Sequence, residues 1–234
     1  MQLNWIQSSL IAMGLIIAGY FIGNMHLKGK QYDRYVTVKG LSEREVAADL
    51  AIWPINITLA GNNLTLIQSD IEKQKKEVIA FFKTQGFADD ELTVGTTNIA
   101  DSKVDMYGNN NYREFRYIAK TEFTIRTNDL ERLKKSLSAS LELLSRGILL
   151  GSKNDWSPIE YQFTKLNEMK PPMIEEATKN ARLVAEKFAL DSESKVGKIR
   201  NANQGLFSIT DRDQNTPEFK IVRIVSTIEY QLED

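Results

Sequence analysis

Residues 171–190 read PPMIEEATKNARLVAEKFAL and form a strong amphipathic pattern. At about 100° per residue, the apolar side chains fall on one helical stripe, which we expect to be buried, and the charged side chains lie opposite it. Pro171 is expected near the first helical position, where a missing N–H costs nothing. The small alanines would let the helix lie close to what it covers. The stripe consists of Ile174, Ala177, Ala181, Val184, Ala185 and Phe188, and the opposite side of Glu175, Lys179, Arg182 and Glu186.

The composition is that of a folded protein with an ordinary surface. The 234 residues suffice for one large domain or two small ones, and 42% of them are hydrophobic. A formal net charge of −1 provides no overall field that favours nucleic acid, so no nucleic-acid partner is expected. The sequence has no cysteine, which excludes disulfides, thiolate nucleophiles and zinc–cysteine sites.

The N-terminus contains an apolar segment. Residues 10–22, LIAMGLIIAGYFI, carry no charge, and the uncharged run extends back to Met1. The apolar core is short for a membrane-spanning helix, which needs about 20 residues, but its uncharged flanks can complete the span. We therefore predict a signal anchor over residues 1–28. Its apolar side chains are Leu10, Ile11, Leu15, Ile16, Ile17, Phe21 and Ile22.

A cleaved secretory signal peptide is the close alternative to this anchor. No clear A-x-A cleavage site follows the apolar core and no Lys or Arg precedes it, which favours the uncleaved form. The charges around the segment leave its orientation open. Lys28, Lys30 and Arg34 all follow it, and by the positive-inside rule they would weakly retain the C-terminal side in the cytoplasm.

The rest of the chain predicts a short linker, residues 29–34, and an α+β domain, residues 35–234. The expected order is ββ-α-ββ-α-β-α-ββ, in which about three amphipathic helices cover largely antiparallel sheet. Pro54 breaks the second strand after Trp53, so an edge strand or a bulge is expected there. Strands are expected near residues 35–38, 50–60, 92–99, 114–126, 159–163, 195–203 and 219–232, and helices near 63–85, 128–147 and 171–190.

The middle helix carries a stripe of leucines. Asn128 is expected to cap it, with Glu131 in the capping-box position, and Gly147 to end it. The stripe lasts barely two heptads, so it predicts packing in a core rather than a coiled coil. Its members are Leu130, Leu133, Leu137, Leu141 and Leu144.

Three pieces of sequence carry a family resemblance. They are the run VTVKG at residues 36–40, the run EATKNAR at 176–182 that leads into AEK at 185–187, and the run VGKI at 196–199 before the final strand. With these pieces the chain from Tyr35 to the C-terminus resembles the SIMPL-domain family, which includes the bacterial YggE-like proteins. Trp53-Pro54 is a departure, because many relatives have Pro-Asp there.

The resemblance implies an exported protein whose soluble part faces the periplasm, and it outweighs the three basic residues in the question of orientation. It also implies an association with oxidative-stress defence and, in some relatives, a homo-oligomeric ring. No enzyme activity is established for the family. We therefore expect a protein of the bacterial inner membrane with a single N-terminal anchor, and a cleaved periplasmic form is the alternative.

The residue types offer little for catalysis. His26 is the only histidine and abuts the apolar segment, which excludes a Ser-His-Asp triad and a histidine metal cluster from the soluble part. No phosphate-binding loop or dinucleotide fingerprint occurs. The carboxylate runs at 89–91 and 175–176 are more simply solvated surface groups than an acid–base pair or a cation site. Trp53 and Trp156 are more simply core or subunit contacts than ligand contacts. No catalytic residue, cofactor or metal is therefore expected.

Two leucines lie off their helix stripes and are candidates for a subunit contact. Leu183 lies about 180° from Ile174 among charged residues, and Leu143 lies beside the leucine stripe. The first hypothesis for function is a non-enzymatic, membrane-anchored protein that acts by self-assembly or partner binding. The alternative is a periplasmic binding module for a small or lipidic ligand, and an unrecognised hydrolase comes third. The sequence identifies neither the ligand or partner nor the size of an oligomer.

Overall fold

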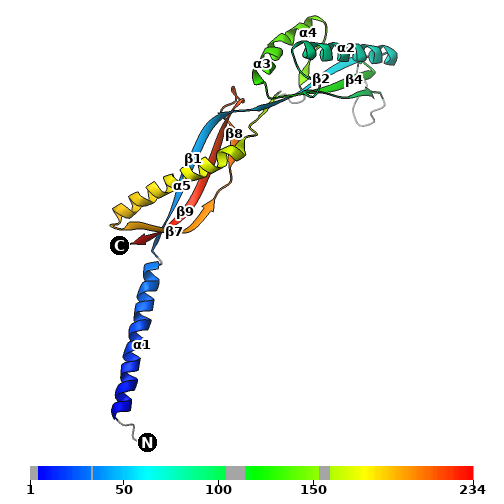
Figure 1. Ribbon diagram of the computed structural model, residues 1–234. Coiled ribbons are helices and arrows are strands. Elements are labelled where there is room, and N and C mark those ends of the chain that lie inside the picture. The colour runs from blue at the N-terminus through cyan, green and yellow to red at the C-terminus, as the bar shows by residue number, and fades with distance from the viewer. Residues whose placement is uncertain (1–4, 33, 104–113, 153–158, 234) are drawn as a thin grey trace. The chain divides into compact units, whose positions relative to one another are not determined.

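The computed structural model describes residues 5–32, 34–103, 114–152 and 159–233 (Figure 1). Trp156 lies outside these ranges. The chain divides into two compact units, and each is described by itself. The mixed α+β class with antiparallel strand pairing is confirmed. Unit 1 comprises Met1–Arg44, Asn167–Thr210 and Ile221–Asp234, and unit 2 comprises Glu45–Leu166 and Asp211–Lys220.

The N-terminal helix α1 spans Trp5–Tyr32 (Figure 1). It includes residues 29–32, which were expected to belong to a linker. Residues 8–23 are all exposed. In the described part of the chain, no helix combines the length and the apolarity that crossing a membrane requires.

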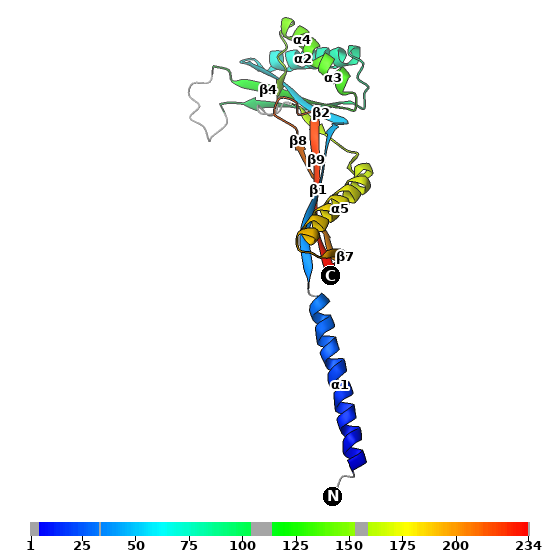
Figure 2. The ribbon, with the colours of Figure 1, turned by 90° about the vertical axis from the view of Figure 1, so that its left-hand side faces the viewer.

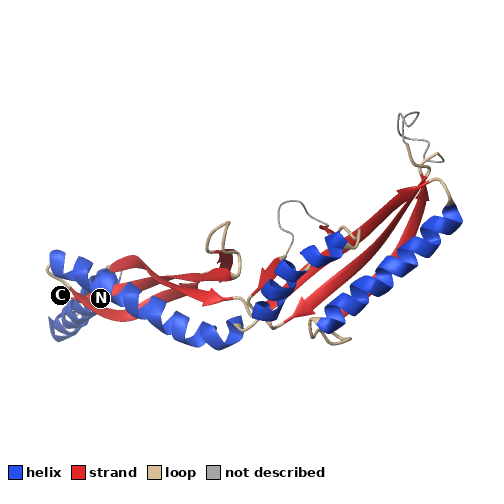
Figure 3. Ribbon diagram, turned by 90° about the horizontal axis from the view of Figure 1, so that it is seen from above, coloured by secondary structure: helices blue, strands red, loops and turns tan. Residues whose placement is uncertain are grey.

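Besides α1, unit 1 consists of a sheet with one helix on one face (Figures 2 and 3). The strand order is β1-β9-β7, and β8 also pairs with β9. The strand at the start of the domain runs well past its predicted end, and β8 lies between the last two strands that the sequence predicts. The bounds are β1 (Tyr35–Ala47), α5 (Leu166–Asp191), β7 (Lys195–Gln204), β8 (Ser208–Asp211) and β9 (Phe219–Glu233).

Helix α5 is packed on the sheet through small residues. Its buried stripe repeats every fourth residue and consists of Met173, Ala177, Ala181, Ala185 and Ala189. A Cβ added to Gly40 on β1 would lie 1.8 Å from the carbonyl oxygen of Ala177, so the helix backbone lies almost against the strand. Only small side chains fit between two backbones at this spacing.

Two parts of the prediction for this helix were wrong. The helix begins at Leu166 rather than near Pro171. Val184 and Phe188 are 39% and 58% exposed instead of buried. The close approach at Gly40 explains why Val184 and Phe188 are exposed. Only a row of small side chains fits against the strand there, and this row, Ala177, Ala181, Ala185 and Ala189, is called here the alanine ridge.

Unit 2 is a second sheet with its helices on one face (Figure 2). The strand order is β3-β4-β2-β5, and β6 also pairs with β2. One hydrophobic cluster contains Trp53, which meets Phe82 edge to face with ring centroids 5.8 Å apart. The strands are β2 (Leu50–Gly61), β3 (Leu92–Asp101), β4 (Tyr117–Thr127), β5 (Gly151–Ser152) and β6 (Glu160–Gln162), and the helices are α2 (Leu64–Thr84), α3 (Leu130–Ala139) and α4 (Leu141–Ser145).

Pro54 lies inside the sheet of unit 2 without a bulge. It pairs with Thr124 in a continuous register between β2 and β4. On the other side of β2, β5 pairs with positions 55 and 56 and β6 with positions 50–52, so positions 53 and 54 fall between the two short strands. A residue that lacks an N–H is tolerated at such a gap. The irregularity occurs instead in β3, between Val94 and Thr97.

The leucine stripe of the middle helix is only partly buried. The helix breaks at Ser140 into α3 and α4, and its N-cap is Asp129, whose side chain accepts from Arg132 N at 2.9 Å, rather than Asn128. Leu133 and Leu143 are fully buried. Three leucines expected in the core are exposed instead: Leu137 at 39%, Leu141 at 71% and Leu144 at 54%.

Candidate functional site

A hollow of about 660 Å³ lies in unit 2 beside the start of α3. Its walls come from the junction of β1 and β2, the loop before β3, the first turns of α3 and the start of β9. Apolar surface is supplied by residues such as Ala47 and Phe219. The charged side chains of the lining are Glu91, Asp129, Glu131, Arg132, Lys134 and Glu218.

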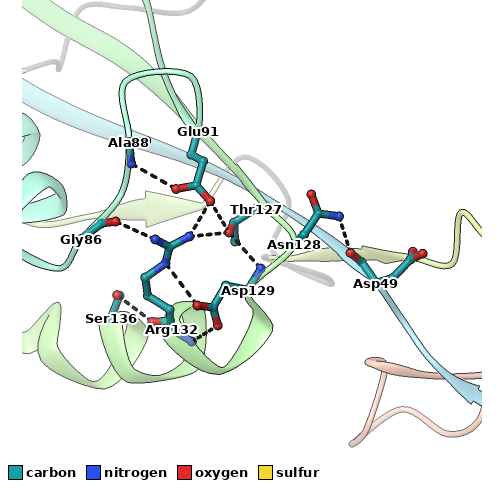
Figure 4. Close-up of polar contacts among 9 residues, drawn as sticks. All are labelled: Asp49, Gly86, Ala88, Glu91, Thr127, Asn128, Asp129, Arg132 and Ser136. Carbon is teal, nitrogen blue, oxygen red and sulfur yellow. Dashed lines mark hydrogen bonds and ion pairs between the residues drawn. The ribbon is translucent and has the colours of Figure 1, made fainter.

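Arg132 is the centre of the polar contacts at this hollow (Figure 4). Its Nη1 donates to Gly86 O at 2.6 Å, and its Nη2 donates to Glu91 Oε1 at 2.5 Å and to Thr127 Oγ1 at 3.1 Å. The guanidinium carbon also lies 4.7 Å from the ring centroid of Phe87. One side chain therefore joins the loop after α2, the end of β4 and the first turn of α3.

Glu91 is held as an ionised acceptor. It accepts from Thr127 Oγ1 at 2.5 Å and from Ala88 N at 3.0 Å, in addition to Arg132. Burial raises the pKa of Glu91, but these hydrogen bonds and the positive charge of Arg132 lower it by more, so the pKa lies below its usual value. The interpretation of Glu91 as a solvated loop residue was wrong. Its contacts bind the loop to α3 and leave it poorly suited to proton transfer.

The other wall of the hollow contains a second ion pair. Lys134 Nζ lies 3.2 Å from Glu218 Oε1 and 3.6 Å from Glu131 Oε1. The hydrogen bond to Glu218 raises the pKa of Lys134 by more than burial lowers it. Both cations of the lining are thus paired. The lining has four carboxylates and two cations, so its formal charge is negative, and the side chains of Asp129 and Glu131 remain 54% and 78% exposed.

Glu176, one of the two carboxylates at positions 175–176 on α5, also has a structural role. Glu176 Oε2 accepts from Ser42 Oγ at 2.9 Å and from Arg44 Nη2 at 3.1 Å. These two hydrogen bonds lower the pKa of Glu176, and they connect α5 to β1 within unit 1. In the residues that the structure describes, no group of three or more His, Cys, Asp or Glu side chains could hold a metal ion.

The apolar side chains predicted for the membrane anchor all lie on α1, and at least half of each is exposed. No other described element presents large apolar side chains in such a run. The exposed fractions are 65% for Leu10, 56% for Ile11, 69% for Leu15, 73% for Ile16, 50% for Ile17, 67% for Phe21 and 68% for Ile22.

The two leucines expected at a subunit contact have different environments. Leu143 is fully buried in the core of unit 2, so its side chain is not available to a second subunit, and that expectation is corrected. Leu183 is 54% exposed on α5 in unit 1. Leu143 shares the buried side of α3 and α4 with Leu133 and Ser136, whereas Leu141 and Leu144 are exposed.

Comparison with known proteins decides the family. The SIMPL family profile, described as "Protein of unknown function (DUF541)", matches residues 36–221. The chain belongs to the SIMPL family. The SIMPL match includes both the contact of Gly40 with α5 and the Arg132 network, so it covers parts of each unit.

Other comparisons add no functional information about this SIMPL protein. No curated protein matches the chain. One similar solved structure is the ligand-free regulatory subunit of aspartate kinase from Thermus thermophilus, at 12% identity over 82% of this chain and 87% of that chain. The TM-score is 0.22, which is too low to carry an argument about fold or activity.

Proposed function

We propose that this SIMPL protein is a membrane-attached, non-enzymatic protein of the bacterial inner membrane that binds copies of itself or a partner protein in the periplasm. The exposed apolar surface of α1 carries this proposal. A helix that is apolar on all sides is normally covered, by protein or by lipid. Attachment of α1 to a membrane would remove this surface from water.

The state of the charged groups supports a role without catalysis. Four charged groups at the hollow, Glu91, Arg132, Lys134 and Glu218, are engaged with one another or with neighbouring backbone. A general acid or base needs a proton-transfer site within hydrogen-bond reach of a substrate. Here the hydrogen bonds of Glu91 and Arg132 are used to connect the loop before β3 to the start of α3.

The attachment is tested by separating membrane and soluble fractions of cells that express the full chain. Leu15→Lys combined with Ile16→Lys should move the protein to the soluble fraction, because each charge near the centre of a membrane segment costs about 2.5–3.5 kcal/mol. Ser9→Lys, near the end of the apolar run, is the control and should remain with the membranes. If the double variant also remains there, attachment through α1 is wrong.

Self-association is tested by the mass of the full chain in detergent, measured by light scattering with the detergent contribution subtracted. A defined multimer supports the proposal, and a monomer at all concentrations contradicts it. Leu183→Asp tests the exposed leucine of α5. A multimer of unchanged size in this variant removes Leu183 from the proposed contact.

The association with oxidative-stress defence rests on the resemblance to the SIMPL family. Cells that lack the protein should survive peroxide less well than cells in which the full chain is restored. Equal survival of the two strains would exclude this role under the conditions used.

The hollow in unit 2 favours a second function, the binding of a small ligand. Its volume suits a small molecule, and its exposed carboxylates, Asp129 and Glu131, suit a ligand with a cationic group. A panel of small amines should then raise the melting temperature by mass action, and Glu131→Gln should reduce the rise. A melting temperature that no amine changes would exclude this class of ligand.

A further inference from the structure

The sheet of unit 1 ends in β1 on one side and in β7 on the other, with β9 between them (Figure 1). In the described part of the chain, β9 is the only strand that pairs with β1. The carbonyl of Arg34 accepts from Leu232 N on β9. Because successive residues of a strand direct their backbone groups to opposite sides, those of Tyr35, Thr37 and Lys39 point away from β9. This side of β1 is called here the open edge.

Helix α5 blocks one half of β1 and leaves the open edge free. Asn180 stands one position before a residue of the alanine ridge, and its Nδ2 donates to the outward carbonyl of Leu41 at 2.9 Å. Val184 and Phe188 also stand one position before a ridge residue, so they belong to the same row of α5. They are 39% and 58% exposed. The row is therefore polar where it meets Leu41 and apolar toward the C-terminus of α5.

The direction of α5 places the apolar part of this row beside the open edge. The backbone of α5 at Ala177 lies against Gly40. Just past the C-terminal end of the helix, Ser194 Oγ accepts from Arg34 Nη2 at 2.9 Å. Helix α5 thus runs antiparallel to β1, and its last turns lie along the N-terminal half of the strand.

The rise per residue shows which side chains are level with one another. A strand advances about 3.3 Å per residue and a helix about 1.5 Å, so two residues of β1 span about four of α5. Counted from the contact at Gly40, Val38 is level with Val184. Two residues earlier, Val36 is level with Phe188. Exposed apolar side chains therefore overhang an open strand edge, an arrangement that suits the addition of a further strand.

The strand at the other side of the sheet, β7, has the side chains that such a site requires. It is exposed along most of its length. Ile199 pairs with Tyr230 and is 49% exposed. Ala202 pairs with Ile228 and is also exposed. Opposite residues of paired strands project to the same face, and Tyr230 and Ile228 pack against α5. The apolar side chains of β7 are thus on the helix side of the sheet.

The hydrogen bonds between β1 and β9 fix the register of these two strands. At one end Leu232 N donates to Arg34 O at 2.9 Å. At the other end Ala48 N donates to Glu218 O at 2.7 Å. The two bonds are 14 residues apart on each strand, so the register between them has no net shift.

This register relates β1 to β7 across β9. Tyr230 lies opposite Val36 on β1 and opposite Ile199 on β7, so Ile199 is level with Val36. In the same way Ala202 is level with Val38. The exposed apolar side chains of β7 and the overhanging side chains of α5 therefore occur at the same two levels of the sheet.

The interruption after β7 falls at the level where α5 blocks β1. Gly205 N donates to Val225 O at 3.0 Å, and strand structure resumes only at β8. In the same register Val225 lies opposite Leu41, whose carbonyl is occupied by Asn180. A strand with the shape of β7 is thus interrupted where β1 cannot accept a further hydrogen bond.

We propose that β7 of a second copy of this chain adds to the open edge of β1, parallel to it and at the same level. Ile199 of the added copy then lies beside Val36 and beneath Phe188. Ala202 of the added copy lies beneath Val184. Both β1 and β7 run antiparallel to β9, so the added strand continues the sheet in its own pattern. The inference rests on the self-association in the proposed function and assigns two strands to it.

Pairing of β1 with β1 of a second copy is the less suitable arrangement. Two identical edges meet about a two-fold axis, which makes the strands antiparallel. Only residues 33 and 34 separate α1 from β1, so this pairing would put the two α1 helices at opposite ends of the pair. Parallel addition of β7 leaves every α1 at the same end, as attachment of all copies to one membrane requires.

Charge does not select the partner strand. Cations occur on both edges, Lys39 on β1 and Lys195, Lys198 and Arg200 on β7. The contact is made by backbone groups and apolar side chains instead. Because salt screens the repulsion between exposed cations, a higher salt concentration should not weaken the multimer.

The first test changes side chains on the two sides of α5 in the full chain in detergent. Phe188→Asp should weaken association by about ten-fold or more, because it places a charge in an apolar contact. Ile199→Asp should have the same effect from the other strand. Leu190→Asp is the matched control, since Leu190 is 76% exposed on the same helix but on the other side of the alanine ridge. Circular dichroism verifies the fold of all three variants.

The outcomes separate this inference from the proposed function. A multimer that Phe188→Asp and Ile199→Asp both weaken, and that Leu190→Asp leaves intact, supports both. A multimer that either of the first two variants leaves unchanged, or that Leu190→Asp weakens equally, overturns the contact of β1 with β7 and leaves self-association standing. A wild-type monomer overturns both.

The second test uses the absence of cysteine from the sequence. Thr37 and Asn201 are both exposed and both lie opposite Glu229, so Thr37 of one copy comes beside Asn201 of the next. In a chain with Thr37→Cys and Asn201→Cys, oxidation should link copies to one another. Within one copy β9 separates the two positions by about 9–10 Å, which is too far for a disulfide.

The two single variants are the controls for this linkage. Neither Thr37→Cys nor Asn201→Cys alone should link copies, because each thiol meets a residue without sulfur. A linked dimer of Thr37→Cys alone would show pairing of β1 with β1 and overturn the proposal. A double variant that links no more than the single variants contradicts the parallel addition, even where the protein is multimeric. Since each copy has both edges, the linked product should extend beyond two copies.

Discussion

Arg132 and Glu91 stand 41 positions apart in the sequence, and their side chains meet at 2.5 Å in unit 2. Glu91 immediately precedes β3 and Arg132 lies in the first turn of α3, so the pair joins two segments that are distant in the sequence. Thr127, at the end of β4, hydrogen-bonds to both side chains. The wall of the hollow therefore depends on a contact that no local pattern contains.

Removal of this guanidinium should destabilise unit 2. Arg132→Met keeps much of the side-chain volume but leaves the Glu91 carboxylate without its cation. The two side chains are 27% and 19% exposed, so partial screening by water limits the expected loss to about 1–2 kcal/mol. Urea unfolding followed by the fluorescence of buried Trp53 measures it. Arg132→Lys keeps the charge without the forked donors and should lose less. Equal losses in the two variants would show that the hydrogen bonds of the guanidinium, and not its positive charge, provide the stabilisation.

The same contact should make stability depend on pH. Because the pKa of Glu91 is lower in the folded state than its usual value of 4.5, the contribution of the carboxylate is present above that value. It is lost as the pH falls through the folded-state pKa. The difference in unfolding free energy between the unchanged protein and Glu91→Gln should therefore be largest near pH 7 and decrease on acidification below about 4.5. A difference that stays constant from pH 7 to pH 3 would contradict this assignment.

Gly40 should tolerate no larger residue. In Gly40→Ala the new methyl group meets the backbone of Ala177, which cannot move without shifting α5. We expect a loss of at least about 3 kcal/mol, at the upper end of the cost of overpacking. Gly61→Ala is the comparison, because its nearest neighbour is the flexible end of Ile67 at 3.1 Å, and it should lose less than about 1 kcal/mol. Thermal unfolding monitored by circular dichroism distinguishes the two.

The alanine ridge of α5 can be tested against the stripe that the sequence suggests. Phe188→Ser should change the unfolding free energy by less than about 0.5 kcal/mol, because Phe188 is 58% exposed. Ala181→Leu should cost about 1–3 kcal/mol, because Ala181 is fully buried against the sheet. The opposite ranking in chemical denaturation would restore the stripe through Val184 and Phe188.

The class of fold and many elements follow from periodicity alone. The first long helix is an example, because Ile67, Ile71, Val78 and Phe82 recur at helical spacing and are all buried, and Asn63 caps the helix. Such elements are predictable because the side chains that bury them lie within one segment. The choice between the alanine ridge and the adjacent row on α5 was not predictable, since it depends on Gly40, more than a hundred positions away.

The hollow and the exposure of Leu137, Leu141 and Leu144 are the parts that sequence reasoning missed. Glu91 and Arg132 are each ordinary surface residues until the fold brings them together. The leucine stripe has the spacing of a core, but the buried side chains of α3 and α4 are Leu133, Ser136 and Leu143, and most of the stripe is exposed. A pattern of spacings identifies a stripe, but which side of the helix the core covers depends on segments elsewhere in the chain.

The two prolines inside α5 have a consequence for the opening of this helix. Neither Pro171 nor Pro172 has an amide proton, so the carbonyl groups of Asn167 and Glu168 lack the usual donors four positions later. Two of the backbone hydrogen bonds that would connect the first turn to the rest of α5 are therefore missing. Amide protons beyond Met173 should therefore exchange with deuterium slowly and as one group, while those of the first turn exchange early, and α5 can fray at this end without releasing its alanine ridge.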